Sequence, residues 1–486
     1  MTDIAFASAS KLARMVRARK IGCVELLEHY LARVKRHNPM VNAIIATRLP
    51  QARKRAAEAD RQLRRRGAKP GPLFGVPMTV KESFDMVGLP TTWGLPEFRT
   101  HRARTNALAV ERLLAAGANV FGKSNVPVML ADWQSFNPVY GTTNNPWDLG
   151  RTPGGSSGGS AAALAAGLTG LEYGSDIGAS VRNPAHYCGV YGHKPSYQVV
   201  SPQGQHLGGL VAVSDIAVIG PLARSADDLA LAMSVTAGPD AIDGAGWRLS
   251  LPRARQKSLS EFRVAVLASH PTAEVDASVV QVVNEVARFA AKRGAKVSHR
   301  ARPDFDHDEA HRVYIQLLRF ATSGRQADAQ YQRFLAERPK LSARDRSYRA
   351  EFIRGTTMAP REWAQLNETR HRMRLAWAAF FRDWDVLLCP TATTAAFPHM
   401  QSGERWERMI DVNGRPQPTT TQMFWAGYSG MCFLPSTVAP AGLTRDGLPV
   451  GVQIVGAQYA DYTTIRFAQL LEREFGGFVP PPAFAA

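Results

Sequence analysis

Two serines within a glycine-rich loop are the residues of this sequence whose types and spacing most directly suggest chemistry. The loop occupies residues 154–160, where Ser156 and Ser157 stand between glycines. It runs into the alanine-rich stretch 161–166, which predicts a helix closed by Gly167. Glycine lacks a Cβ, so such a loop can bring backbone N–H groups very close to another group. A flexible linker is disfavoured, because linkers do not usually continue directly into a strong helix former.

Three kinds of chemistry place glycines and hydroxyls at the start of a helix. A phosphate-binding loop requires a lysine followed by Ser or Thr after the second glycine, and none follows Gly158 or Gly159. A nucleophile elbow must leave a buried strand, whereas residues 145–153 have the composition of turns. The third possibility is a serine whose partners lie elsewhere in the chain, which requires a base and a second activated hydroxyl.

Two other segments supply candidates for these partners. Ser180 lies in residues 174–184, where small residues crowd around it and several consecutive N–H groups could converge. Lys81 ends an apolar run of strand character that starts at Phe74. A lysine is seldom buried, and burial lowers its pKa by disfavouring the charged form. The alternative is a lysine at a strand end whose ammonium group reaches solvent.

The three segments, in this order and at these intervals, resemble the amidase signature family of serine hydrolases, which use a Ser-Ser-Lys triad. Similar blocks extend the resemblance over nearly the whole chain, with the weakest stretch from about residue 241 to 380. These blocks lie at residues 122–125, 145–148, 192–195, 220–225, 388–391 and 446–453.

The resemblance implies a role for each residue of the triad. Ser180 would be the nucleophile, Ser156 a relay hydroxyl on a cis peptide, and Lys81 the base. The oxyanion hole would be formed by the N–H groups of Ile177, Gly178, Ala179 and Ser180. An acyl-enzyme would form and be released by water, with no metal and no other cofactor.

The sequence departs from the family pattern at a few positions. Ala179 stands where the family usually has glycine, so a positive φ there would cost roughly 1–2 kcal/mol. Glu82-Ser83 replaces the more usual Asp-Asn, and His193 replaces an apolar residue. The neighbours of Ser180, Asp176 and Arg182, are interpreted as structural.

By analogy with the family, the substrate pocket is expected to be apolar or aromatic. This predicts aryl or alkyl amides as substrates, with carbamates and esters as further candidates. The residues expected to line the pocket are Met129, Leu130, Trp133, Met423, Phe424 and Trp425.

Strand-like runs at 118–121, 386–388 and 452–455 alternate with amphipathic stretches, which is typical of an α/β fold. The family implies a mixed central sheet covered by helices on both faces. We predict one large domain over residues 1–486. Within it we expect a basic helical segment (1–70), a core with the triad (71–240), a variable pocket region (241–430) and a return to the core (431–486).

Composition sets further expectations. Four dispersed cysteines, the absence of an apolar leader and the absence of a long apolar segment favour a reduced, cytoplasmic protein without a membrane span. The formal net charge is +18, and residues 1–70 hold 17 lysines and arginines against 5 acidic residues, a net +12. A solvated helix face is favoured over nucleic-acid binding for this segment, because no aromatic residues are interleaved with it.

Several alternatives remain open. A family branch serves as one component of an amidotransferase that acts on misacylated tRNA, and partners of that kind would explain basic surface. A catalytically inactive binding homologue is a third possibility. The spacing of His307 and His311 lacks the glutamate of a zinc motif and favours a charged helix face. A homodimer is compatible with the sequence.

Overall fold

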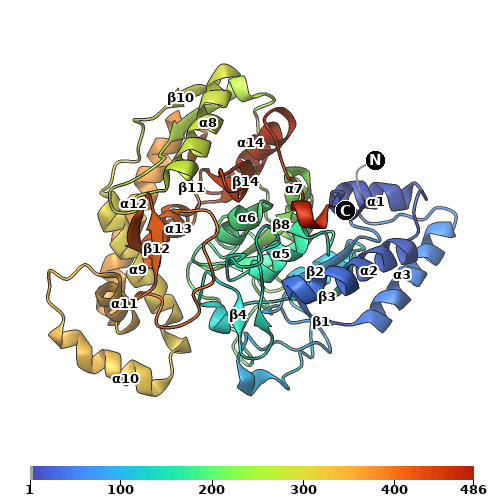
Figure 1. Cartoon of the computed structure of the whole chain (residues 1–486), viewed down its shortest axis with the longest axis horizontal. Coiled ribbons are helices and arrows are strands. Elements are labelled where there is room, and N and C mark those ends of the chain that lie inside the picture. Colours follow the sequence, from blue (N-terminus) through green and yellow to red (C-terminus); the bar gives the residue numbers. More distant parts are fainter. Residues whose placement is uncertain (1–3, 486) are drawn as a thin grey trace.

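Short apolar runs of the sequence form the strands of an eight-stranded sheet at the centre of the protein (Figure 1). The computed structural model describes residues 4–485. The strands of this sheet are, in spatial order, β10 (Lys296–Ser298), β9 (Arg263–Val266), β11 (Val386–Pro390), β15 (Pro449–Val455), β14 (Ser436–Leu443), β7 (Tyr191–Lys194), β8 (Val218–Ala223) and β6 (Glu172–Asp176).

The central sheet is mixed. Strands β10, β9 and β11 pair in parallel, and every other neighbouring pair is antiparallel. The predicted strands at 386–388 and 452–455 are confirmed as parts of β11 and β15, which lie side by side. The predicted α/β class with a mixed sheet is therefore confirmed.

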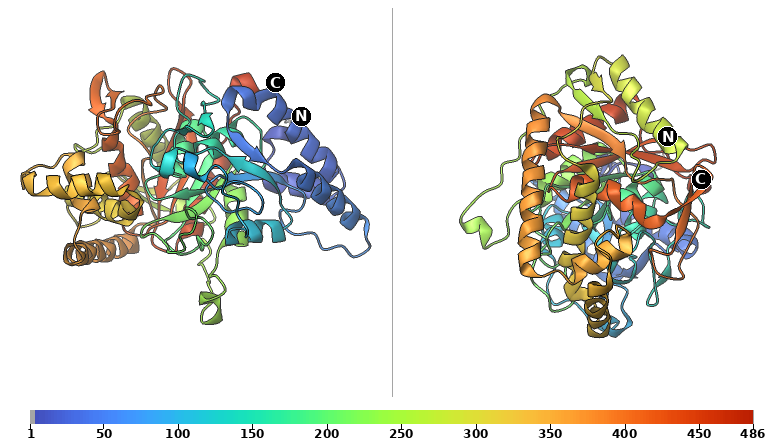
Figure 2. Two further views of the ribbon diagram at one scale, coloured as in Figure 1. Left: turned by 90° about the horizontal axis from the view of Figure 1, so that it is seen from below. Right: turned by 90° about the vertical axis from the view of Figure 1, so that its left-hand side faces the viewer.

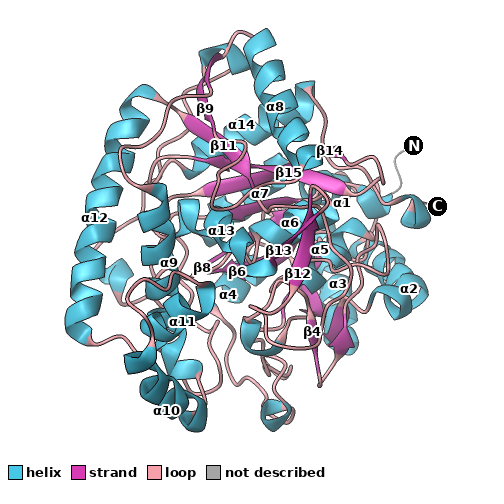
Figure 3. Cartoon of the chain, turned by 60° about the vertical axis from the view of Figure 1, so that its left-hand side comes forward, coloured by secondary structure: helices cyan, strands magenta, loops and turns pink. Residues whose placement is uncertain are grey.

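Helices cover both faces of this sheet, as alternation along β7 shows. Residues that follow one another in a strand point to opposite faces. Gly192 faces Ala185 of one helix, whereas the next residue, His193, bonds Asp461 of another. Figure 3 shows the helices arranged around the strands.

The α-helices are α1 (Ala9–Arg17), α2 (Cys23–Val41), α3 (Leu49–Arg64), α4 (Leu108–Ala115), α5 (Gly158–Ala165), α6 (Arg182–Cys188), α7 (Ala226–Thr236), α8 (Ala277–Lys292), α9 (His307–Thr322), α10 (Asp328–Glu337), α11 (Tyr348–Thr356), α12 (Pro360–Asp383), α13 (Met423–Gly430) and α14 (Asp461–Glu474).

A second, three-stranded sheet carries the lysine that the sequence singled out. Its order is β1 (Ile44–Thr47), β3 (Asn119–Ser124) and β2 (Pro77–Lys81), and β2 also contacts β6 of the central sheet. Every residue of β2 is buried, so the strand carries Lys81 into the interior at its last position. Two strand pairs complete the set: β4 (Phe136–Asn137) with β5 (Gly141–Thr142), and β12 (Met409–Val412) with β13 (Arg415–Pro418).

Helices α1, α2 and α3 lie in the basic N-terminal segment, and part of the positive charge of this segment is used in packing. Arg48 and Arg55 on the α3 side donate to the backbone carbonyls of Val120 and Ala118 at 3.2 and 2.9 Å. The arginines of the run 61–66 are exposed. The positive charge therefore serves both the contact of α3 with β3 and the solvated face of the helix.

One arginine of α2 joins three distant parts of the chain. The Arg33 guanidinium donates to the carbonyls of Gly167 and Ala166, just beyond α5, at 3.1 and 3.0 Å. It also donates to the carbonyl of Phe484 at 2.8 Å. The N- and C-terminal regions lie side by side in all views (Figures 1 and 2), and this contact attaches both to the end of α5.

The variable region 241–430 lies mostly on the side of the molecule opposite the N-terminal helices (Figure 1). Figure 2 shows the segment around η4 (Asp243–Ala245), a 3₁₀ turn, projecting from the body. Within residues 4–485, no helix is both long enough and apolar enough to cross a membrane. The four cysteines are buried as free thiols.

Candidate active site

The glycine-rich loop forms the N-terminal approach to α5 and packs directly against backbone. A Cβ built on Gly159 would lie 2.3 Å from the backbone nitrogen of Asn125, so only glycine fits there. The peptide between Gly155 and Ser156 is cis, as the resemblance implied. Helix α5 begins at Gly158 and Gly167 has a φ of +68°, which confirms the predicted helix and its glycine C-terminus.

Lys81 reaches the serine of this loop. Its Nζ lies 2.6 Å from Oγ of Ser156 and donates to Oγ of Ser175 at 3.0 Å. Burial lowers the pKa of Lys81 well below its usual value; the charge of Asp176 opposes this shift, and that of Arg325 adds to it. A neutral amine within hydrogen-bond distance of a hydroxyl is the arrangement that a general base requires.

Ser180 follows β6 and precedes α6, next to the glycine-rich loop. The N–H of Ser157 donates to the carbonyl of Ser180 at 3.0 Å, which joins the two serine segments. Within residues 4–485, the hydroxyls of Ser156 and Ser180 make no hydrogen bond with each other. Catalytic hydrogen bonds are often long in structures without substrate. The structure thus brings Lys81, Ser156 and Ser180 into adjoining segments of one site.

A buried ion pair holds the loop that precedes Ser180. Asp176 and Arg182 are both fully buried and pair through two hydrogen bonds of 2.8 and 3.0 Å. Burial would raise the pKa of Asp176, but the charge and hydrogen bonds of Arg182 outweigh it and hold that pKa low. The Asp176 carboxylate also accepts from the N–H groups of Ala179 and Val181 at 3.0 and 3.1 Å. Both residues therefore have the structural role that the sequence suggested.

One of the expected oxyanion donors is already hydrogen-bonded within this loop. The N–H of Ala179 donates to Asp176 Oδ1 at 3.0 Å, so this donor is occupied in the structure. The N–H groups of Ile177, Gly178 and Ser180 donate to no other group in the described part of the chain. Unpaired backbone donors at a buried site are rare, so these three are available for a bound oxygen.

Ala179 adopts the left-handed conformation that glycine accommodates most easily. Its φ is +66° and its side chain is fully buried. An L-residue pays roughly 1–2 kcal/mol for this conformation. The loop therefore keeps its geometry despite the methyl group, and the surrounding hydrogen bonds hold it there.

Two aromatic side chains fix the carbonyls of the same loop. The Tyr314 hydroxyl, from α9, donates to the carbonyl of Ile177 at 3.0 Å, and the Trp133 indole donates to that of Gly178 at 2.7 Å. In a trans peptide the carbonyl and the following N–H point in opposite directions. Tyr314 therefore orients the N–H of Gly178, and Trp133 orients that of Ala179 toward Asp176.

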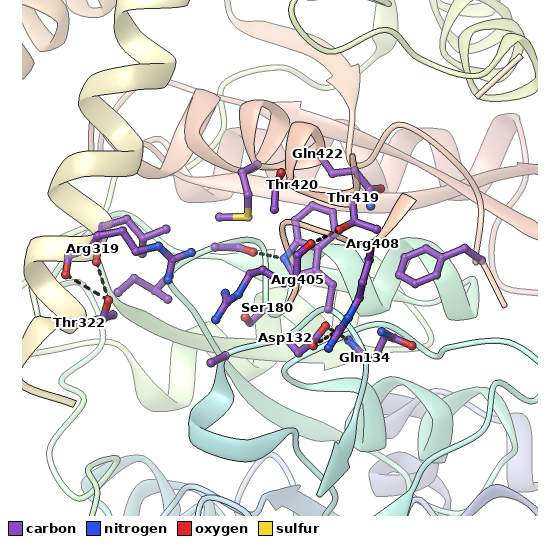
Figure 4. A pocket seen from close by; sticks show the side chains of 17 residues that line it. Asp132, Gln134, Ser180, Arg319, Thr322, Arg405, Arg408, Thr419, Thr420 and Gln422 are labelled. Atoms are coloured by element: carbon purple, nitrogen blue, oxygen red, sulfur yellow. Dashed lines mark hydrogen bonds and ion pairs between the residues drawn. The ribbon is translucent and has the colours of Figure 1, made fainter. Parts of the chain in front are cut away.

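A pocket opens beside Ser180, with a cavity volume of about 80 Å³. Its walls come from the loop 131–134, the loop before Ser180, helix α9 and the segment 397–423 (Figure 4). Among the residues expected from the sequence, Trp133 and Met423 line it.

The other expected pocket residues lie elsewhere. Met129 and Leu130 belong to a short 3₁₀ turn that ends before the first lining residue, Ala131. Phe424 lines a separate, smaller cavity, and Trp425 is fully buried. Successive residues of a helix point in different directions. Met423 of α13 therefore lines the pocket, whereas Trp425 belongs to the core.

Sequence reasoning missed several residues of the site. Ser175 contacts Lys81, and its place next to Asp176 in a segment already singled out was the available signal. Tyr314, Arg319 and Arg405 come from outside the recognised motifs, so no local pattern marked them. Their contribution depends on tertiary packing.

The departures from the family pattern prove to be supporting contacts. The Glu82 carboxylate accepts from the backbone N–H of Trp93 at 3.0 Å, and His193 bonds Asp461 at 3.1 Å. His307 and His311 lie in an aromatic cavity beside Phe424. Across residues 4–485 no group of three or more His, Cys, Asp or Glu side chains is arranged to hold a metal ion.

Comparison with known proteins agrees with this architecture. The amidase family model matches residues 25–465. An acylamidase of Rhodococcus erythropolis is 33% identical, over 96% of this chain and 94% of the relative. A glutamyl-tRNA(Gln) amidotransferase component of Gloeobacter violaceus is 30% identical over 99% of each chain. A similar solved structure is a chain of a protein complex described as revealing the evolutionary origins of an s-triazine catabolic enzyme. It is 28% identical to this chain, with a TM-score of 0.81 over 97% of this chain and 99% of that chain.

The family match and the acylamidase relative show a hydrolase that acts on amide C–N bonds. The chain belongs to the amidase signature family.

Proposed function

We propose that the protein is a stand-alone amidase that uses Ser180 as nucleophile, Ser156 as relay and Lys81 as base. The observation that carries the proposal is the 2.6 Å approach of Lys81 Nζ to Ser156 Oγ, in a loop hydrogen-bonded to the Ser180 segment. The substrates are aryl or alkyl amides, and carbamates and esters would react by the same steps.

In the first half of the reaction, Ser156 Oγ takes the proton of Ser180 and passes its own proton to neutral Lys81. The Ser180 oxygen forms a bond to the amide carbon, and negative charge develops on the carbonyl oxygen. The N–H groups of Ile177, Gly178 and Ser180 stabilise that charge. Each donor of this kind typically contributes on the order of 100-fold or more in rate.

In the second half, the C–N bond breaks and the leaving amine takes the proton back from Lys81 through Ser156. The acyl group stays on Ser180 as an ester. Water, deprotonated by the same relay, then releases the carboxylic acid and restores the serine hydroxyl. Burial lowers the pKa of Lys81, which favours the neutral amine that this step needs.

The test uses the purified protein alone, with a p-nitroanilide and a primary amide as substrates. We expect amine or ammonia release and labelling of Ser180 by a fluorophosphonate. The Ser180→Ala variant should lose both. Cleavage that persists in this variant would contradict the assignment of the nucleophile, and absent labelling of the wild type would favour an inactive binding homologue.

The second candidate is a component of a tRNA-dependent amidotransferase, which the 30% identity to such a protein over 99% of this chain supports. That function requires companion proteins and misacylated tRNA. Activity that appears only in their presence would replace the stand-alone amidase by this candidate.

A further inference from the structure

The pocket beside Ser180 contains more positive than negative charge. Its described lining residues include three arginines, Arg319, Arg405 and Arg408, and one acid, Asp132. Arg408 Nη1 pairs with Asp132 Oδ2 at 2.6 Å, so that acid is already neutralised. Two guanidinium groups therefore face the pocket without an acidic partner among residues 4–485.

Arg319 is the more deeply placed of the two. It is 6% exposed, and its guanidinium packs over the rings of Tyr348 and Phe352 and donates from Nη2 to the Tyr348 hydroxyl. Its Nε is buried and has no hydrogen-bond partner within the part of the chain that the structure describes. A buried donor on a charged group is costly to leave unpaired, so a bound hydrogen-bond acceptor at Arg319 Nε would be favourable.

Arg405 lies across the pocket from α9. Its side chain is half-buried and makes no hydrogen bond or ion pair with any described residue. Figure 4 shows Arg319 and Arg405 directed into the pocket that Ser180 lines. Burial lowers the pKa of Arg319, and the charge of Arg405 pushes that pKa in the same direction. Arginine nevertheless stays protonated in proteins, so an anion bound between the two side chains would relieve their repulsion.

We propose that the substrate carries a carboxylate group, which Arg319 and Arg405 bind while the scissile amide lies at Ser180. A planar guanidinium matches a carboxylate through paired hydrogen bonds, and this geometry distinguishes arginine from a point charge. The apolar walls at Trp133, Leu318 and Met423 receive the alkyl or aryl part of the same molecule. This inference rests on the proposed amidase and narrows its substrates to anionic amides.

The experiment compares pairs of amides that differ only in charge. On the acyl side, the monoanilides of succinic, glutaric and adipic acids are compared with anilides in which an isopropyl group replaces the carboxylate. On the amine side, N-acetyl-4-aminobenzoate is compared with N-acetyl-4-isopropylaniline. We expect kcat/KM for at least one anionic member to exceed that of its neutral partner by about 10-fold or more, and higher ionic strength to reduce the ratio.

Variants assign the preference to the pocket. Arg405→Gln should reduce the ratio of anionic to neutral kcat/KM by about 10- to 100-fold, and Arg405→Lys by less. The control is Arg445→Gln, at an exposed position between β14 and β15, which should keep the wild-type ratio. Equal effects of Arg405→Gln and Arg445→Gln would overturn the proposal.

A binding measurement separates this inference from the proposed function. Calorimetry with the Ser180→Ala variant should show tighter binding of the anionic anilide than of its isopropyl partner. Neutral amides that bind and react as well as the anionic ones through Ser180 would refute the carboxylate site and leave the amidase intact. Cleavage that persists in Ser180→Ala would refute the amidase mechanism, while the calorimetry would still report on the carboxylate site.

Discussion

The hydroxyl of Tyr314 donates a 3.0 Å hydrogen bond to the carbonyl of Ile177, 137 positions earlier in the chain. Tyr314 is fully buried on α9, and Gly427 of α13 leaves room for its ring, because a Cβ there would lie 2.3 Å from it. Helix α9 thus reaches the loop whose N–H groups we propose as oxyanion donors. If the N–H groups of this loop bind the oxyanion as we propose, α9 is part of their support.

Replacing Tyr314 by phenylalanine should lower kcat by about 10-fold with little change in KM. The variant removes an orienting bond and not a donor to the oxyanion, so the loss is smaller than the roughly 100- to 1,000-fold typical of a deleted donor. Steady-state kinetics on a neutral anilide measure it.

The matched control is Tyr428→Phe. Tyr428 is a buried tyrosine of α13 whose hydroxyl has no hydrogen-bond partner within residues 4–485. Its kcat should stay at the wild-type value. An equal loss in both variants would mean that the Tyr314 hydroxyl has no specific role.

Replacing Ser156 by alanine should reduce kcat by about 100- to 10,000-fold, the range that general acid–base catalysis contributes. The fold should persist, because the hydroxyl is small and its partner Lys81 retains the bond to Ser175. Circular dichroism and the melting temperature check the fold, and Ser234→Ala on the exposed side of α7 serves as control. Full activity of Ser156→Ala would remove this serine from the relay.

Activity should fall in acid as Lys81 gains a proton. Burial places its folded pKa well below the ordinary value of 10.5, so the amine is neutral at a pH where a solvated lysine is charged. The acidic limb of the kcat/KM profile on a neutral anilide should therefore lie well below pH 10.5. A limb centred near the ordinary value would contradict a buried, neutral base.

The same shift has an effect on stability with a definite sign. Between the folded pKa of Lys81 and its ordinary pKa of 10.5, the unfolded chain binds a proton at Lys81 and the folded chain does not. In this pH interval the free energy of unfolding therefore rises with pH. Below the folded pKa of Lys81, the full free-energy cost of burying its charged amine lowers the stability of the folded chain. Lys81→Met should lack this contribution, which urea unfolding of both proteins across the pH range will measure.

The sequence could predict the parts of this site that local pattern encodes. The glycine loop, the helix that follows it and the strand that ends at Lys81 carry signals in adjacent residues, and each lies where the sequence predicts it. The pocket wall formed by α9 and the segment near Arg405 could not be predicted, because it depends on how elements that are distant in the sequence pack together. The engagement of the Ala179 N–H by Asp176 likewise follows from one carboxylate orientation, which no spacing encodes.

Replacing Ala179 by glycine should change the free energy of unfolding by less than about 1 kcal/mol. Relief of the left-handed conformation, roughly 1–2 kcal/mol, is offset by the loss of a buried methyl, about 0.8 kcal/mol, and by the entropy of glycine, about 0.5–1 kcal/mol. The same change at Ala161, buried within α5, relieves nothing and should cost about 1.5–2 kcal/mol. Denaturant titrations of both variants give the difference, and equal destabilisation would show that the φ of Ala179 carries no cost.

The guanidinium of Arg33, held between the end of α5 and the carbonyl of Phe484, also bears on the activity of the enzyme. Helix α5 follows the loop that presents Ser156, and its last carbonyls share their donor with a residue near the far end of the chain. A chain that ends after β15, the last strand of the central sheet, lacks the hydrogen bond between Arg33 and Phe484. We therefore expect that C-terminal truncations which remove Phe484 weaken the support of α5 and lower activity, although they leave Lys81, Ser156 and Ser180 in place.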